Sequence, residues 1–77
     1  MDRLYVLIKV APGHIEDILS AVTQNKYVKE ASAVTGSYDV IVKIEGDSIS
    51  EVLSTVVKEI HGIEGITSTE TLVAVEL

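Results

Sequence analysis

An internal repeat restricts the fold of this chain more than any other sequence feature. Shifted by 34 positions, "VLIKVAPGHIEDILSAV" (6–22) aligns with "VIVKIEGDSISEVLSTV" (40–56), with six identities in seventeen positions. Each copy begins with alternating apolar residues and continues with apolar residues at helical spacing, which predicts a strand followed by a helix. With a one-residue shift, the similarity continues between residues 28–34 and 63–69, and both segments lead into β-rich sequence. The predicted order is strand, helix, strand, twice.

Both predicted helices have start signals. Pro12 and Gly13 precede the first helix, and Ser48 with Glu51 forms a capping box at the second. Gly62 is expected to cap the C-terminus of the second helix. These signals place the helix starts within about one residue of Gly13 and Ser48.

Two strand-helix-strand units predict an α+β fold of the ferredoxin-like βαββαβ type. In this fold one antiparallel four-stranded sheet carries both helices on one face. The 77 residues suffice for one domain only, so we expect a single domain over residues 1–77. The chain has no cysteine, so neither disulfides nor thiolate metal sites can supplement so small a core.

The two faces of this sheet are predicted to differ. One face is uniformly aliphatic and is expected to lie under the helices; it comprises Val6, Ile8, Val10, Val40, Val42 and Ile44. The other face carries Tyr5, Leu7, Ile41 and part of the segment 72–75, and we expect Ala31 and Ala33 to line it. Exposing such side chains costs about 1.5 kcal/mol or more each. A second copy is the simplest cover, so we infer a homodimer packed sheet on sheet, with an open-faced monomer and a hetero-partner as the alternatives.

Composition argues against several classes of partner. Twelve acidic and six basic residues give a net charge of −6, and the basic residues are scattered, which disfavours nucleic acid and anionic membranes. No apolar run approaches the about 20 residues that span a bilayer. We therefore expect a cytoplasmic protein without cofactor or metal. His14 and His61 are interpreted as surface residues, and His61 suits the C-terminal end of a helix dipole.

Two polar clusters are candidates for ligand binding. The first is the turn Gly36-Ser37-Tyr38-Asp39, where Gly36 permits close approach, Asp39 can receive an ammonium group and Tyr38 can cover it. The second is the run 67–71, "TSTET", whose hydroxyls can bind a carboxylate. Taken alone, each cluster also suits a plain hairpin or a half-exposed strand.

Together, "VTGSYDVIVKI" and "GIEGITSTETLVAV" resemble the ligand-sensing (RAM) domain of the Lrp/AsnC transcriptional regulators. The resemblance extends over essentially all 77 residues. The sequence differs from the family pattern at its start, where the usual helix-turn-helix is missing. We therefore expect a stand-alone sensing domain that does not bind DNA directly.

The resemblance implies a dimeric α+β barrel whose dimers assemble into rings, with an amino acid effector bound between dimers. It maps the ligand site onto Gly36, Tyr38, Asp39, Thr67 and Thr69. It also implies a role in transcription regulation without enzymatic activity. Because the DNA-binding segment is missing, we add the hypothesis that the domain passes its signal on by co-assembling with a full-length Lrp/AsnC regulator.

Three alternatives stay open from the sequence. A small dimeric α+β barrel enzyme would use Tyr5 or Tyr27, although no base or metal set accompanies them. An ACT-type regulatory domain would pair side by side and carry a glycine-rich first loop. A purely structural assembly subunit would bind no ligand at all.

Overall fold

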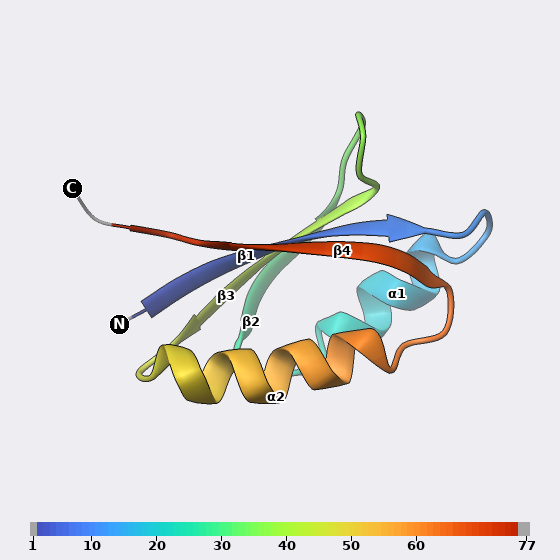
Figure 1. Cartoon of the computed structure of the whole chain (residues 1–77). Helices are drawn as coiled ribbons and strands as arrows, with labels where there is room; N and C mark the ends of the chain where they lie inside the picture. Colours follow the sequence, from blue (N-terminus) through green and yellow to red (C-terminus); the bar gives the residue numbers. More distant parts are fainter. Residues whose placement is uncertain (1, 76–77) are drawn as a thin grey trace.

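The computed structural model describes residues 2–75, apart from the side chains of residues 55 and 57. The elements follow in the order β1 (Asp2–Val10), α1 (Ile15–Val22), β2 (Val28–Ala33), β3 (Val40–Gly46), α2 (Ile49–His61) and β4 (Ile66–Val73). The strands form one antiparallel sheet in the order β2-β3-β1-β4. Both helices cover one face of this sheet, as Figure 1 shows. The predicted ferredoxin-like fold is confirmed.

The core lies between the sheet and the helices, and the fully buried hydrophobic side chains in the described part of the chain are all aliphatic. The alternating residues Leu4, Val6 and Ile8 of β1 are buried, as are Val40, Val42 and Ile44 of β3. Ile18 and Val22 of α1 and Val52, Val56 and Ile60 of α2 meet them. The period of two in the strands and the helical spacing in the helices therefore converge on one layer, as the repeat predicted.

The helix starts follow the predicted signals. The Ser48 hydroxyl accepts a hydrogen bond from the Glu51 N–H, and the Asp2 carboxylate accepts one from the Ile49 N–H at 3.0 Å. These bonds satisfy two of the free N–H groups at the start of α2. Gly62 caps the helix with an α-helical backbone and donates its N–H to the carbonyls of the last turn.

One expectation about the second strand is wrong. Ala31 pairs with the buried Val42 and packs against the core, and Ala33 pairs with the buried Val40. Val28 also packs against the core, although it lies three residues from Ala31. A register shift between Val28 and Glu30 allows both side chains to face the helices. The opposite face of β2 is instead formed by Glu30 and Ser32.

Candidate functional site

The end of β1 is an irregular segment that is contacted by two polar side chains, one from the loop before β3 and one from β4. The pairing of β1 with β4 shifts between Lys9 and Val10. From one side, Asp39 Oδ2 accepts a hydrogen bond of 2.9 Å from the Val10 N–H. From the other side, Thr67 Oγ1 donates one of 3.2 Å to the Lys9 carbonyl. The structure thus brings two predicted site residues, Asp39 and Thr67, to the same two residues of β1.

The loop between β2 and β3 (residues 34–39, the hairpin loop) rises away from the helix layer in Figure 1. Its backbone is held at the base, where the Asp39 N–H donates to the Ile8 carbonyl at 2.9 Å and the Val34 N–H donates to the Asp39 carbonyl at 2.8 Å. Gly36 has a φ of +113°, a conformation that residues with a Cβ rarely adopt.

Tyr38 belongs to a small cluster with Lys9 and Glu70, which we call the tyrosine cluster. The Lys9 ammonium lies 5.6 Å from the centre of the Tyr38 ring, and the Tyr38 hydroxyl donates to Glu70 at 3.0 Å. This hydrogen bond, together with burial and the Glu70 charge, raises the pKa of Tyr38. Tyr38 therefore stays protonated and connects the hairpin loop with Lys9 of β1 and Glu70 of β4.

A hollow of about 370 Å³ lies at the start of β4 and is lined by His61, Ile66, Thr67, Ser68 and Thr69. We call it the His61 hollow. His61 Nε2, at the end of α2, lies 2.9 Å from Thr69 Oγ1. Thr69 pairs with the buried Ile8 and so lies on the helix side of the sheet. Glu70, the partner of Tyr38, pairs with Leu7 on the opposite side.

The predicted site residues are therefore divided between two places. Gly36, Tyr38 and Asp39 lie at the hairpin loop, and Thr67 and Thr69 line the His61 hollow. Asp39 and Thr67 are linked through β1, whereas Tyr38 and Thr69 lie on opposite sides of the sheet.

Three neighbours of these residues were not predicted from the sequence to be site residues, namely Lys9, His61 and Glu70. Lys9 carried one signal, its identity with Lys43 in the internal repeat. His61 carried none, because its contact with Thr69 depends on the path of the turn between α2 and β4.

Gly65 in that turn has a φ of +100° and lies against His14, and an added Cβ would come within 2.8 Å of that side chain.

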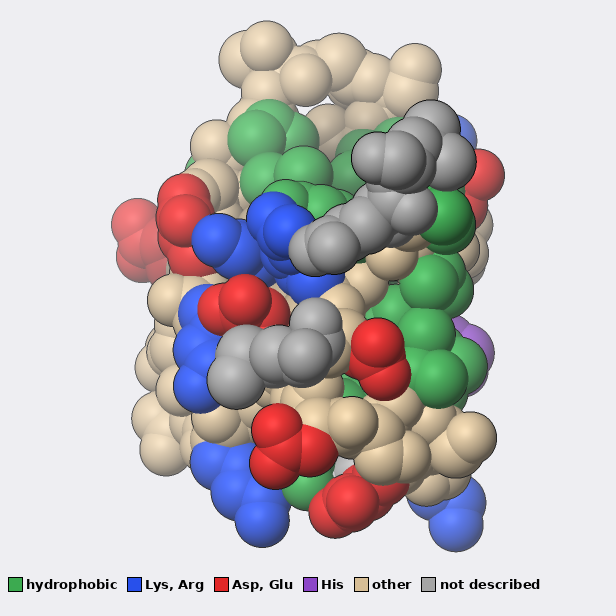
Figure 2. All heavy atoms as spheres, turned by 90° about the vertical axis from the view of Figure 1, so that its left-hand side faces the viewer, with side chains coloured by type: hydrophobic (Ala, Val, Ile, Leu, Met, Phe, Trp, Pro, Cys, Tyr) green, Lys and Arg blue, Asp and Glu red, His purple; other side chains and the backbone are tan. Residues whose placement is uncertain are grey.

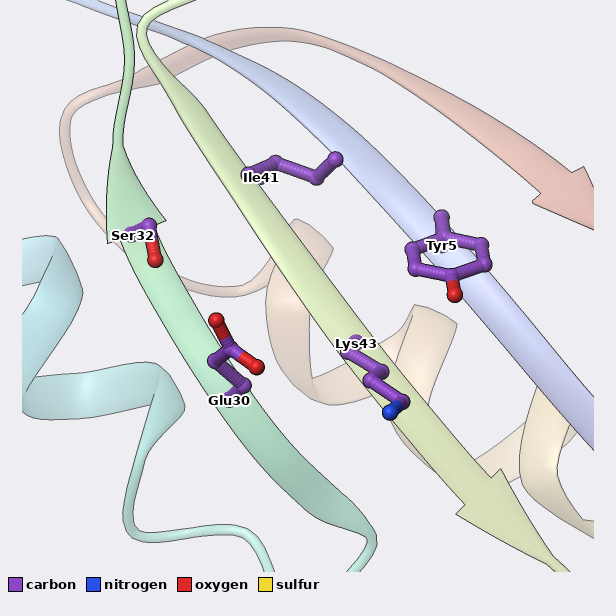
Figure 3. A pocket seen from close by; sticks show the side chains of 5 residues that line it. All are labelled: Tyr5, Glu30, Ser32, Ile41 and Lys43. Carbon is purple, nitrogen blue, oxygen red and sulfur yellow. The ribbon is translucent and has the colours of Figure 1, made fainter.

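The sheet face without helices, which we call the open face, contains a second hollow of about 200 Å³. Figure 3 shows its five lining side chains, which come from three adjacent strands: Glu30 and Ser32 from β2, Ile41 and Lys43 from β3, and Tyr5 from β1. Glu30 and Lys43 are cross-strand partners, as are Tyr5 and Lys43. The hollow thus combines opposite charges with aromatic and aliphatic surface.

The charges of the open face balance. The strand register places twelve residues on this face: Arg3, Tyr5, Leu7, Lys9, Glu30, Ser32, Ile41, Lys43, Glu45, Ser68, Glu70 and Leu72. Three of them are basic and three acidic, so the net charge of −6 lies outside this set. Viewed from the end where β1 begins, Figure 2 shows basic and acidic side chains interspersed beside exposed hydrophobic ones.

Within the described part of the chain, no helix is long and apolar enough to cross a membrane. Among the same residues, no group of three or more His, Asp or Glu side chains is arranged to hold a metal ion.

A comparison with protein families decides what kind of domain carries these features. The model described as the Lrp/AsnC ligand binding domain matches residues 3–77. This chain belongs to the Lrp/AsnC ligand-binding domain family. The resemblance based on residues 34–44 and 62–75 is confirmed.

Two curated relatives of this Lrp/AsnC domain are transcriptional regulators. The HTH-type transcriptional regulator FL11 of Pyrococcus furiosus is 30% identical over 73 residues, which cover 95% of this chain and 48% of the relative. FL11 of Pyrococcus abyssi is 31% identical over 72 residues, or 94% of this chain and 47% of the relative. The chain thus spans about half the length of the curated relatives that it matches.

Solved structures share the fold closely. FFRP-DM1 superposes with a TM-score of 0.90 at 29% identity, covering 97% of this chain and all of that one. TTHA0845 from Thermus thermophilus gives 0.92 at 28% identity, with 100% and 96% covered. The regulator NMB0573 of Neisseria meningitidis, solved as an L-Met complex, gives 0.85 at 13% identity over 97% of this chain and 50% of its own. This last likeness shows the fold alone.

Proposed function

We propose that this Lrp/AsnC domain is an amino acid sensor that binds a free amino acid at the end of β1 and couples binding to self-assembly. The observation that supports this proposal best is the convergence of Asp39, from the hairpin loop, and Thr67, from β4, on Val10 and Lys9 of β1. Held this way, the Asp39 carboxylate can receive the ammonium group of an amino acid.

Each predicted residue has a chemical role in this proposal. Asp39 uses one oxygen for the Val10 N–H, and its remaining acceptor capacity is available to an ammonium group. Gly36, without a Cβ, lets the ligand approach the backbone, and the Tyr38 ring forms a wall. Thr69 supplies a hydroxyl for the carboxylate, and Thr67, whose hydrogen goes to the Lys9 carbonyl, lines the site beside it. A protein of the same fold, NMB0573, has been solved as a complex with the free amino acid L-Met.

The complete site needs more than one chain, because Tyr38 and Thr69 lie on opposite sides of the sheet. We propose that the amino acid binds at a contact between dimers, where the hairpin loop of one copy meets the His61 hollow of another. Ligand that binds only the assembled form stabilises it by RT ln(1 + [L]/Kd), about 2.7 kcal/mol at a hundredfold excess over Kd. Dimers linked through such sites would form rings.

The dimer itself is proposed to form through the open face. Tyr5, Leu7 and Ile41 are only half-buried in one chain, and Leu72 is 43% exposed. A second copy offers the same apolar residues and the same balanced charges. The rest of the surface is acidic, so two copies repel each other elsewhere. Co-assembly with a full-length Lrp/AsnC regulator through the same surfaces would pass the signal to DNA.

A structural subunit without ligand is the second candidate, and one observation favours it. Asp39 and Thr67 already have structural roles, since they fix the end of β1. Isothermal titration calorimetry against the twenty amino acids, one at a time, separates the two candidates. A sensor gives saturable heat with one or a few of them, and a structural subunit gives none.

Asp39→Asn is the decisive variant for this titration. Asparagine keeps a carbonyl oxygen for the Val10 N–H but removes the charge that receives the ammonium group. We expect binding to weaken at least about tenfold, the scale of a charge-assisted hydrogen bond. Asp17→Asn, the same change at an exposed position of α1, is the matched control and should bind like the wild type. Unchanged binding by Asp39→Asn would refute the role of Asp39.

A further inference from the structure

The contact between His61 and Thr69 is the feature of the His61 hollow that the predicted site does not explain. His61 lies at the last position of α2, and its Nε2 is 2.9 Å from Thr69 Oγ1. Apart from these two residues, the hollow is lined by Ile66, Thr67 and Ser68. No carboxylate is among its described lining residues, so its polar groups are hydroxyls and one imidazole.

The direction of this hydrogen bond decides what Thr69 can offer a ligand. If the imidazole carries a hydrogen on Nε2, it donates to Thr69, and the Thr69 hydrogen is free to be donated to a third group. If Nε2 is unprotonated, Thr69 donates to the imidazole and has only lone pairs left. The first arrangement makes the hollow a donor site that suits an anion, and the second makes it an acceptor site.

The position of His61 at the end of α2 favours the first arrangement. The C-terminal end of a helix carries partial negative charge and stabilises an imidazole that has a hydrogen on both ring nitrogens, so that Nε2 donates. Thr67 in the same hollow already donates its hydrogen to the Lys9 carbonyl. Thr69, oriented by His61, is therefore the threonine whose hydrogen remains available.

We infer that His61 is a positioning residue that orients the Thr69 hydroxyl as a hydrogen-bond donor to the α-carboxylate of the amino acid. This inference rests on the proposed function, because it assigns one end of the same ligand. It places the carboxylate in the His61 hollow and the ammonium group near Asp39. It also gives His61, interpreted from the sequence as a surface residue, an indirect part in binding.

The tautomer of His61 tests the first step without any ligand. Nitrogen NMR of the uniformly ¹⁵N-labelled wild-type protein distinguishes a protonated Nε2 from an unprotonated one. We expect His61 to carry its hydrogen on Nε2, alone or as the doubly protonated imidazolium. A neutral ring with hydrogen on Nδ1 only would overturn the inference, because Thr69 would then have to donate to His61.

Binding of the twenty L-amino acids to His61→Ala and His61→Gln tests the second step. For each amino acid that binds the wild type, His61→Ala should weaken the binding affinity about tenfold. His61→Gln should stay within about threefold of the wild type, since the glutamine amide can donate to Thr69 in the same way. Equal binding by His61→Ala and the wild type, or equal loss in both variants, would overturn the inference while leaving amino acid sensing intact.

The α-carboxamide of each binding amino acid and the Thr69→Val variant complete the test. The carboxamide lacks the anionic group, so its affinity should respond little to His61→Ala. The double variant His61→Ala/Thr69→Val should bind about as weakly as Thr69→Val alone, because both changes remove one donor. Additive losses would show that His61 acts independently of Thr69. If none of the twenty amino acids binds the wild-type protein, this inference and the proposed function are both overturned.

The His61 variants are not expected to affect folding. His61 is exposed, so the melting temperature of each variant should stay within a few degrees of the wild type.

Discussion

The two faces of the sheet are built from alternate residues of the same strands, yet they differ in burial and in charge. On the helix side, Leu4, Val6 and Ile8 of β1 are buried by the chain's own helices. On the open side, the intervening Tyr5 and Leu7 remain half-buried and lie among paired charges. The first face makes the fold self-sufficient in one chain. The second face has the composition of an interface, apolar in part and electrically neutral.

The comparison predicts its largest effect for the helix-covered face. Ile8→Ala removes a fully buried side chain, and we expect it to lower the free energy of unfolding by about 2–5 kcal/mol. Urea denaturation followed by circular dichroism measures the change. Val34→Ala, at an exposed apolar position of the hairpin loop, should cost less than about 1 kcal/mol. Equal effects of the two changes would contradict the placement of the core.

On the open face, Ile41→Glu should abolish self-association and leave the fold of the single chain intact. A glutamate at the edge of the hollow shown in Figure 3 would place an unpaired charge in an interface, which is strongly unfavourable once desolvated. Sedimentation equilibrium should show a mass reduced to that of the monomer, with the circular dichroism spectrum unchanged. Ile15→Glu, an equal change at an exposed position of α1, should keep the assembly of the wild type.

A smaller effect is expected from the charges of the open face. Lys43→Glu and Glu30→Lys each create a like-charged pair of cross-strand partners, and each should weaken dimerisation about tenfold or more. An equimolar mixture of the two variants should recover dimers, provided that the charges pair between copies. Lys29→Glu mixed with Glu16→Lys, at exposed positions outside the set of open-face residues, is the control. Failure of the mixture to recover would show that the charges pair within one chain.

The smallest effect concerns the tyrosine cluster. Glu70→Gln should return the raised pKa of Tyr38 toward the ordinary tyrosine value of about 10. Since the folded pKa lies above the unfolded one, the stability contributed by the Tyr38–Glu70 bond is complete below about pH 10 and is lost as the pH rises through the raised value. Absorbance titration of tyrosinate measures the pKa. Glu51→Gln, which acts on the raised pKa of Tyr27 instead, should leave Tyr38 unchanged.

The fold could be predicted from the sequence because two periodicities and one repeat agree with one another. The strand β2 was harder, because Val28 and Ala31 lie an odd number of residues apart and cannot face the same side without a bulge. Only the observed register shift reveals that both contact the core. Alternation alone assigned Ala31 and Ala33 to the wrong face.

The candidate site could be predicted only in part. The carboxylate of Asp39 and the hydroxyls of Thr67 and Thr69 indicated ligand binding, but the residues to which they bond are distant in the chain. Asp39 bonds to Val10, 29 positions away, and Thr67 bonds to Lys9, 58 positions away. Both contacts lie at the end of β1, where the pairing with β3 stops at Ile8 and the pairing with β4 shifts between Lys9 and Val10. Composition and spacing carry no signal for such a shift.

Sedimentation velocity of the wild-type protein, alone and with each of the twenty amino acids, tests the central claim of ligand-linked assembly most directly. We predict a dimer or larger species in the absence of ligand and a shift toward larger assemblies with one or a few amino acids, abolished in Asp39→Asn. A monomer whose sedimentation coefficient is changed by none of the twenty amino acids would contradict both the role of the open face and the sensor function.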